Sequence, residues 1–175
     1  MTFNLNRFIE ECLEAVADTN AEERLCHLLQ SAVDDPSIGD AVPMTDEDET
    51  LLHESAELTV YSLRLTPRIL YPPHDHRMTA IIGLYEGVET NYLFRRDGSG
   101  LARTENHNSS APDVLVLPPE TIHAVTNPGK SYSRAIHVYL GPLTKVERSV
   151  WSADGTGERP FDNAYYFEQA RDLTD

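Results

Sequence analysis

The sequence is poor in cysteine and has no surplus of basic residues. Its two cysteines, Cys12 and Cys26, fall at apolar positions of helical patterns, where a buried free thiol is expected rather than a disulfide. Lysine and arginine together number 14 against 29 aspartate and glutamate residues, which gives a formal net charge of −15. Such a chain repels nucleic-acid phosphates and anionic lipids, so we expect neither as a partner.

Long apolar runs are also missing. No stretch approaches the roughly 18 apolar residues that a membrane-spanning helix needs. The first residues, MTFNLNRFIEECLEAV, lack the basic region and the continuous apolar region of a signal peptide. The sequence contains no glycine-rich phosphate loop, no G-x-S-x-G motif and no cysteine–histidine nucleophile pair. Together with the free thiols expected for both cysteines, the missing signal peptide favours a cytoplasmic protein.

The first third of the chain has helical periodicity. Apolar residues recur at spacings of three and four over residues 5–17, the pattern of an amphipathic helix. A second helix is predicted to begin at Asn20, which has the spacing of a capping box with Glu23, and to end before Pro36. Residues 35–50 hold two prolines and a run of acids, so we expect a connecting loop with a solvated charge cluster.

From residue 51 onward, short β segments alternate with turn signals. Candidate strands cover residues 51–55, 58–65, 74–85, 90–95, 101–106, 114–117, 123–126 and 132–140. Many short strands at spacings of about ten residues favour an antiparallel sandwich or barrel. We expect one domain with a helical arm over residues 1–36, a barrel core over 51–141 and a tail over 152–175 that packs across the barrel.

Two histidines stand at the start of one predicted strand. Side chains of an extended strand alternate between its faces, so His74 and His76 point the same way and Asp75 points opposite. The same phase continues through apolar Met78 and Ala80. Burying two imidazoles without hydrogen-bond partners would cost about 2 kcal/mol or more. The pair is therefore predicted to bind a metal. The alternative is a pair of surface histidines at a strand start.

A third candidate ligand is His123, at the start of a strand after LPPETI. A turn followed by a strand would place the His123 side chain in the mouth of a barrel. Without the His74 and His76 pair, the same pattern would indicate an ordinary half-buried histidine. Glu86, the acid in phase on the same strand, lies about 33 Å from His76 along an extended strand, too far to join the set as a carboxylate ligand. Three neutral ligands leave the full +2 charge on a divalent ion and favour anionic ligands, a thiolate above all.

Two segments resemble a known family. PPHDHRMTAIIGLYEG resembles the first motif of the cupins and LPPETIHAVTN the second, and the resemblance covers about residues 51–141. Within the cupins, the chain is most similar to the cysteine dioxygenase-like group of thiol dioxygenases, including the 3-mercaptopropionate dioxygenases. The resemblance implies a mainly β, double-stranded β-helix barrel with an N-terminal two-helix arm. It also implies iron(II) held by His74, His76 and His123, although imidazole suits zinc, nickel, manganese and copper as well.

The last predicted strand, AIHVYLG, aligns three side chains on one face: Ala135, His137 and Tyr139. The resembled group has serine, histidine and tyrosine at this spacing, as a relay beside the iron. The resemblance implies catalytic roles for Tyr139, which would hydrogen-bond dioxygen or substrate, and for His137, which would hold the tyrosine. Ala135 departs from the pattern, so Ser133 or a water would have to supply the hydroxyl. The alternative is a core tyrosine and a packed histidine.

The substrate side departs from the resembled group in two ways. Some cysteine dioxygenases join a cysteine near the histidine pair to the tyrosine, but here both cysteines lie in the helical arm. The carboxylate-binding arginine of the group would lie on the strand before LTVYSLRL, where this chain has His53 in LLHES. We therefore expect His53 or Arg64 to bind the substrate. The other candidate arginines are Arg68, Arg77, Arg95 and Arg96.

These features together predict a metal-dependent dioxygenase. The resemblance implies that both atoms of dioxygen enter the sulfur of a small anionic thiol, a cysteine-like or mercapto acid, to give a sulfinate. Two alternatives stay open: a three-histidine cupin that cleaves a carbon–carbon bond of a diketone-like substrate, and a cupin that binds a small molecule without turnover. A homodimer is the expected assembly where an exposed sheet face is available.

Overall fold

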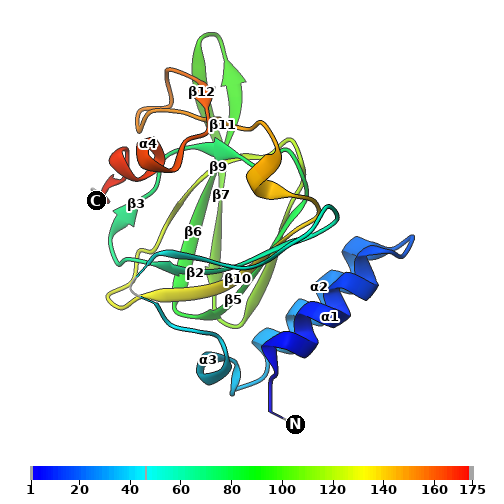
Figure 1. Ribbon diagram of the computed structural model, residues 1–175. Helices are drawn as coiled ribbons and strands as arrows, with labels where there is room; N and C mark the ends of the chain where they lie inside the picture. Colours follow the sequence, from blue (N-terminus) through cyan, green and yellow to red (C-terminus); the bar gives the residue numbers. More distant parts are fainter. Residues whose placement is uncertain (1, 46, 174–175) are drawn as a thin grey trace.

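Two antiparallel β-sheets that face each other form the body of the protein (Figure 1). The computed structural model describes residues 2–45 and 47–173. The first sheet has the strand order β1-β2-β10-β5-β8. Its strands are β1 (Glu49–Glu54), β2 (Thr59–Leu65), β10 (Ser133–Tyr139), β5 (Ala80–Glu86) and β8 (Asp113–Leu117).

The second sheet is built around β9. Its path runs β12-β11-β4-β9-β3-β13, and β6 pairs with both β9 and β7. Its strands are β12 (Arg159–Pro160), β11 (Ser149–Val150), β4 (His74–Asp75), β9 (Ile122–Thr126), β3 (Ile69–Leu70), β13 (Arg171–Asp172), β6 (Val88–Asp97) and β7 (Gly100–Ser110). The chain crosses between the sheets repeatedly, since β5, β8 and β10 belong to the first and β6, β7 and β9 to the second. The predicted double-stranded β-helix barrel with its two-helix arm is therefore confirmed.

Two helices cover the outer face of the first sheet (Figure 1). Helix α1 (Leu5–Val16) and helix α2 (Ala21–Val33) begin and end within about a residue of the predicted positions. Leu29 of α2 packs in one core cluster with Ile81 of β5 and Ile136 of β10. Because the barrel interior lies on the other side of the same strands, this sheet is buried on both faces, as its apolar composition requires.

The ends of the helices differ from the prediction in detail. Asn20 occupies the N-cap position of α2, but its side chain makes no capping hydrogen bond, so the predicted capping box does not form. The cap that does form belongs to α1, where Asn4 Oδ1 accepts from the backbone N–H of Arg7 at 2.9 Å. The predicted loop over residues 35–50 contains a short helix, α3 (Ile38–Ala41).

Gly83 sets how closely α2 approaches the sheet. A Cβ atom added at Gly83 would lie 2.5 Å from Leu29 Cγ and 2.9 Å from Val33 Cγ1, too close for real carbon contacts. We expect Gly83→Ala to lower the free energy of unfolding by about 1–3 kcal/mol, because the helix must shift to admit the methyl group. Urea denaturation of Gly39→Ala is the control, since a Cβ there meets only Arg134 Nη1 at 3.5 Å. Equal stability of the two variants would refute this packing.

The predicted strand over residues 74–85 is wrong as a single strand. The chain leaves the second sheet after β4 and enters the first sheet only at Ala80. Arg77, between them, has a φ of 58°, in the left-handed region that non-glycine residues seldom adopt. The residues between the two strands therefore form a corner from one sheet to the other, and His76 lies at that corner.

Alternate residues of β5 face the barrel interior, as predicted. They share an interior cluster with side chains of β8 and β10. The interior residues of this phase are Met78, Ala80, Ile82 and Leu84. These residues form an apolar wall. The polar groups of the barrel interior therefore come from other strands and from the corner at His76.

The C-terminal segment packs over one end of the barrel (Figure 1). β11 pairs with β4, and β13 pairs with β3, so this segment adds strands to the second sheet. Helix α4 (Asn163–Glu168) brings Tyr166 against Tyr71, with ring centroids 5.8 Å apart. The same tyrosine lies 5.1 Å from the ring of His74. The segment thus forms part of the wall around the predicted metal ligands.

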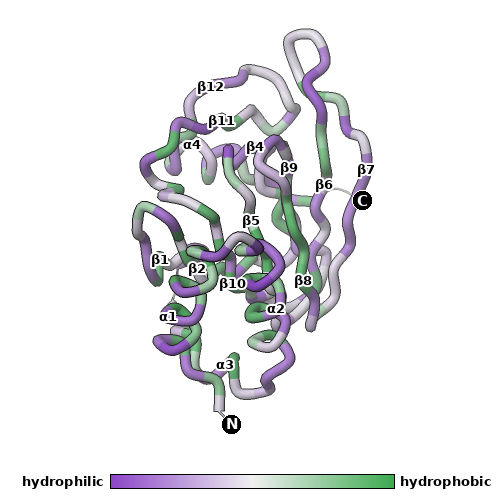
Figure 2. Tube along the Cα trace, turned by 90° about the vertical axis from the view of Figure 1, so that its right-hand side faces the viewer, coloured by the Kyte–Doolittle hydropathy of each residue, from purple (hydrophilic) through white to green (hydrophobic). Residues whose placement is uncertain are grey.

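The hydropathy of the trace follows this architecture. Figure 2 shows hydrophobic stretches along β5 and β8 and a mostly hydrophilic β7 at the edge of the second sheet. Of the helices within residues 2–45 and 47–173, none has the length and apolar character to cross a membrane.

Candidate metal centre

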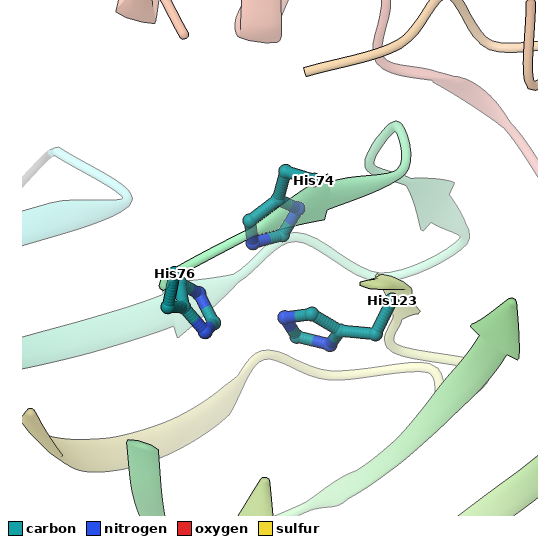
Figure 3. A group of neighbouring side chains, drawn as sticks. All are labelled: His74, His76 and His123. Carbon is teal, nitrogen blue, oxygen red and sulfur yellow. The ribbon is translucent and has the colours of Figure 1, made fainter. Parts of the chain in front are cut away.

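Three histidines meet at one end of the barrel (Figure 3). β4 pairs with β9 so that His74 stands opposite His123, and the corner after β4 brings in His76. One ring nitrogen of each lies within 4.8 Å of the others. The ring centroids are 4.5–5.0 Å apart, and all three side chains are buried. The spacing fits three ligands around a single ion.

Hydrogen bonds fix which nitrogens face that ion. The Nδ1–H of His123 donates to Asn91 Oδ1 at 2.8 Å, and the Nδ1–H of His74 donates to the carbonyl oxygen of Pro72 at 3.1 Å. Each bond leaves the Nε2 lone pair available, as in metal sites with an oriented imidazole. His123 Nε2 is buried and has no hydrogen-bond partner within the described residues. A metal ion would satisfy this atom, so the residues present fit the expected group.

The three imidazoles are neutral at neutral pH. Burial lowers the pKa of His123 to about 4. Burial, and then the neighbouring histidines, hold the pKa values of His74 and His76 well below the usual range. A neutral imidazole has the free lone pair that a metal requires, so these groups are in the ligating form without giving up a proton.

No carboxylate belongs to the cluster. Within the part of the chain that the structure describes, the only candidate metal-ligating group comprises His74, His76 and His123. Glu86, the one acid in phase on β5, lies 3.5 Å from Arg134 Nη1. Three neutral ligands would leave the whole charge of a divalent ion for other ligands to balance.

Asn91 orients one ligand, and its removal should weaken metal binding. We expect Asn91→Ala to lower metal affinity by about 10–100-fold, because the His123 ring loses the acceptor that fixes its tautomer. Competitive titration with a fluorescent chelator measures the effect. Asn106→Ala, on the exposed face of β7, is the control. Unchanged affinity in Asn91→Ala would exclude this role.

Asp75 anchors the segment that carries two of the ligands, His74 on β4 and His76 at the corner after it. Its side chain points away from the cluster, where Oδ1 accepts from the Ser149 backbone N–H at 2.7 Å and Oδ2 lies 2.8 Å from Arg77 Nε. The alternation predicted for His74, Asp75 and His76 therefore holds in spite of the corner. These contacts fix β4 to the C-terminal segment.

The open side of the histidine cluster faces a cavity of about 480 Å³. This volume suits a small organic molecule. Besides the three histidines, the side chains that matter for its chemistry are Glu49, Tyr61, His137, Tyr139, Arg148 and Tyr166.

His137 and Tyr139 form a hydrogen-bonded pair in the cavity wall. His137 Nδ1 lies 3.0 Å from Tyr139 Oη, and both side chains are buried. Burial lowers the pKa of His137 to about 3 and raises that of Tyr139, so both groups are neutral. In the tautomer with Nδ1–H, the imidazole donates to the phenol, and the phenol keeps its own O–H for a ligand. Ser133 does not supply the expected third hydroxyl, because its Oγ donates to Glu89 Oε1 at 2.9 Å.

The two predicted substrate-binding residues lie outside this cavity. Tyr61 of β2 lines it, so Arg64, at the opposite phase of that strand, points to the other face. There its guanidinium lies 3.7 Å from Asp48 and over the ring of Tyr132. His53 of β1 does not line the cavity either. The other candidate arginines do not line the cavity: Arg68, Arg77, Arg95 and Arg96.

The guanidinium that does line the cavity belongs to Arg148, which the sequence analysis did not single out. Its Cζ lies 3.3 Å from the centroid of the Phe161 ring, and burial lowers its pKa. Arg148 stands in an irregular segment just before β11, where no periodicity indicates the direction of a side chain. Glu49 also faces the cavity, although its acidic run was predicted to be solvated. Glu49 is the first residue of β1, so the strand directs its side chain into the cavity and not into solvent.

Comparisons with known proteins concern the fold. No family model matches this chain. An uncharacterized conserved protein with a double-stranded β-helix domain from Klebsiella pneumoniae is similar at 14% identity and a TM-score of 0.47, over 70% of this chain and 86% of that one. The DMSP lyase of Ruegeria pomeroyi is similar at 18% identity and 0.46, over 58% and 46%. Oxalate decarboxylase of Bacillus subtilis is similar at 18% identity and 0.46, over 61% and 29%.

Proposed function

We propose that this protein is a non-haem iron(II) dioxygenase of the thiol dioxygenase type, acting on a small thiol that carries a carboxylate. One observation carries the proposal: three neutral imidazoles without a carboxylate in their cluster face a cavity that also holds a guanidinium. Iron(II) held there would keep its full +2 charge, which favours a thiolate, and would supply the redox chemistry that dioxygen needs. Zinc, nickel, manganese and copper are the other ions that imidazole suits.

The proposed reaction needs no further reactant. The thiol loses its proton, two sulfur–oxygen bonds form, and the oxygen–oxygen bond breaks, so the electrons that sulfur loses reduce dioxygen. The product is a sulfinate. The sulfinate of the product and the thiolate of the substrate are both negative, and each molecule also carries a negative carboxylate. A cation in the cavity therefore stabilises substrate and product alike.

The side chains of the cavity have separate tasks in this proposal. Arg148 binds the substrate carboxylate, because a guanidinium matches a carboxylate with two parallel hydrogen bonds. Phe161 holds the guanidinium by stacking against it. Tyr139 donates its hydroxyl proton toward the reacting end of the substrate, and His137 fixes the phenol. Tyr166 packs against the ring of His74 and shields that side of the cluster from water.

Oxygen uptake by iron-loaded protein tests the proposal against its alternatives. The substrates are L-cysteine, 3-mercaptopropionate, uncharged 2-mercaptoethanol and acetylacetone. We expect oxygen uptake that depends on the thiol. With labelled dioxygen, mass spectrometry should detect both labelled atoms in a sulfinate product. Thiols that carry a carboxylate should turn over faster than the uncharged thiol. Uptake with acetylacetone alone would support carbon–carbon bond cleavage instead. Binding of these compounds without uptake would support a non-catalytic role.

Tyr139→Phe should separate turnover from metal binding. Without the hydroxyl, we expect kcat for the preferred thiol to fall by about 100-fold, because one positioned hydrogen-bond donor is lost. Iron content should not change, since the phenol is not part of the histidine cluster. Tyr85→Phe, on a tyrosine that packs in the helix-side cluster, is the matched control. Unchanged kinetics in Tyr139→Phe would remove Tyr139 from the mechanism.

A further inference from the structure

Glu49 is a carboxylate in the same cavity as the guanidinium of Arg148. It lies on β1, in the first sheet, whereas Arg148 comes from the segment before β11 of the second sheet. Both side chains are half-buried. The Glu49 carboxylate makes no hydrogen bond or ion pair with other groups of residues 2–45 and 47–173, Arg148 included. Two opposite charges therefore share one small volume without direct contact.

The environment of Glu49 favours a cationic ligand. Burial raises the pKa of the Glu49 carboxyl, even though Arg148 acts in the opposite direction. The other charged side chains that line the cavity are exposed: Lys145, Glu147 and Asp162. Asp162 Oδ1 already accepts from the Tyr165 N–H at 2.8 Å. Of the charged side chains lining the cavity within the described ranges, only Glu49 and Arg148 are thus withdrawn from solvent.

A ligand with a single charge would pair with only one of these two groups and would be repelled by the other. A simple mercapto acid would pair with Arg148 and bring its carboxylate near the carboxylate of Glu49, which costs free energy in a partly desolvated site. A ligand that carries both an ammonium and a carboxylate would pair with each group. The two fixed charges thus attract one class of substrate and repel the other.

We propose that Glu49 binds the ammonium group of the substrate while Arg148 binds its carboxylate, so that the cavity selects amino-acid thiols over mercapto acids without an amine. The identity of the thiol rests on the proposed function, but the recognition of the head group does not.

Redox-inert probes test this recognition without any turnover. L-Serine and 3-hydroxypropionate differ from each other by the amine and carry a hydroxyl in place of the thiol. Isothermal titration of zinc-loaded protein measures the affinity for each. We expect the native protein to prefer L-serine by tenfold or more, equal to about 1.4 kcal/mol. Equal affinities, or no binding of L-serine, would overturn the proposal.

Variants then assign the preference to Glu49. Glu49→Gln should lose at least tenfold in affinity for L-serine and bind 3-hydroxypropionate as well as the native protein or better, whereas Glu49→Asp should keep part of the preference. Glu147→Gln makes the same charge change at the exposed rim and should change neither affinity. Equal losses for both probes in Glu49→Gln would reduce Glu49 to a structural role. The preference of the native protein remains a test even if that variant does not fold.

The head-group proposal and the proposed function can fail separately. If no thiol is oxidised but the preference for L-serine depends on Glu49, the function fails and the recognition stands. If thiols are oxidised with a preference that Glu49→Gln leaves intact, the function stands and the recognition fails.

Discussion

A protein with alanine in place of His123 is expected to keep its fold and lose its iron. His123 supplies one of three ligand nitrogens, and its Nε2 has no other partner within the described residues. Two remaining imidazoles hold a divalent ion poorly, so the loss of affinity should exceed the roughly 100-fold that removal of an outer partner causes. Thiol-dependent oxygen uptake should disappear with the metal.

Elemental analysis of anaerobically purified protein measures this effect, with circular dichroism to verify folding. The matched control is His107→Ala, since His107 lies on the exposed strand β7 and belongs to no ligand cluster. Full iron stoichiometry in His123→Ala would contradict the assignment of this ligand. The same experiment applies to His74 and His76.

Replacing Arg148 by methionine should abolish the preference for substrates with a carboxylate. Methionine keeps much of the apolar contact with Phe161 but removes the cation. Truncation of one partner in a buried, hydrogen-bonded charge pair costs about 2–5 kcal/mol. We therefore expect kcat/KM for L-cysteine to fall by about 30-fold to several thousand-fold, and kcat/KM for uncharged 2-mercaptoethanol to change little.

Arg148→Lys separates charge from geometry in this prediction. Lysine keeps the positive charge but loses the planar pair of donors, so an intermediate kcat/KM is expected. Steady-state kinetics with both thiols measure the split. Equal losses for the charged and the uncharged thiol would show that Arg148 supports the structure of the cavity and does not bind the carboxylate.

The helical arm was predictable because its apolar stripes are local and regular. The ends of α1 and α2 follow from periodicity, and Pro36 stops the second helix. The corner between β4 and β5 was not predictable in the same way. The left-handed φ of Arg77 is imposed by the passage from one sheet to the other, and nothing in the alternation of residues 74–85 signals it.

The candidate site was predictable where strand alternation orients its side chains. Alternation puts His74 with His76 and His137 with Tyr139, and the structure brings these pairs to one cavity. Arg148 lies in an irregular segment whose position depends on contacts with Phe161 and on the pairing of β11, which are interactions between distant parts of the chain. The prediction of His53 and Arg64 depended on matching strands by sequence, which does not determine the face of the sheet to which a side chain points.

Anomalous diffraction at the iron edge from crystals of the iron-loaded protein would locate the metal and identify its ligands. We predict a single peak bound by one nitrogen each of His74, His76 and His123, with all remaining positions filled by solvent or added ligand. A carboxylate oxygen of Glu49 bound to the ion, or an ion bound away from the three imidazoles, would exclude a three-histidine iron site without a carboxylate ligand.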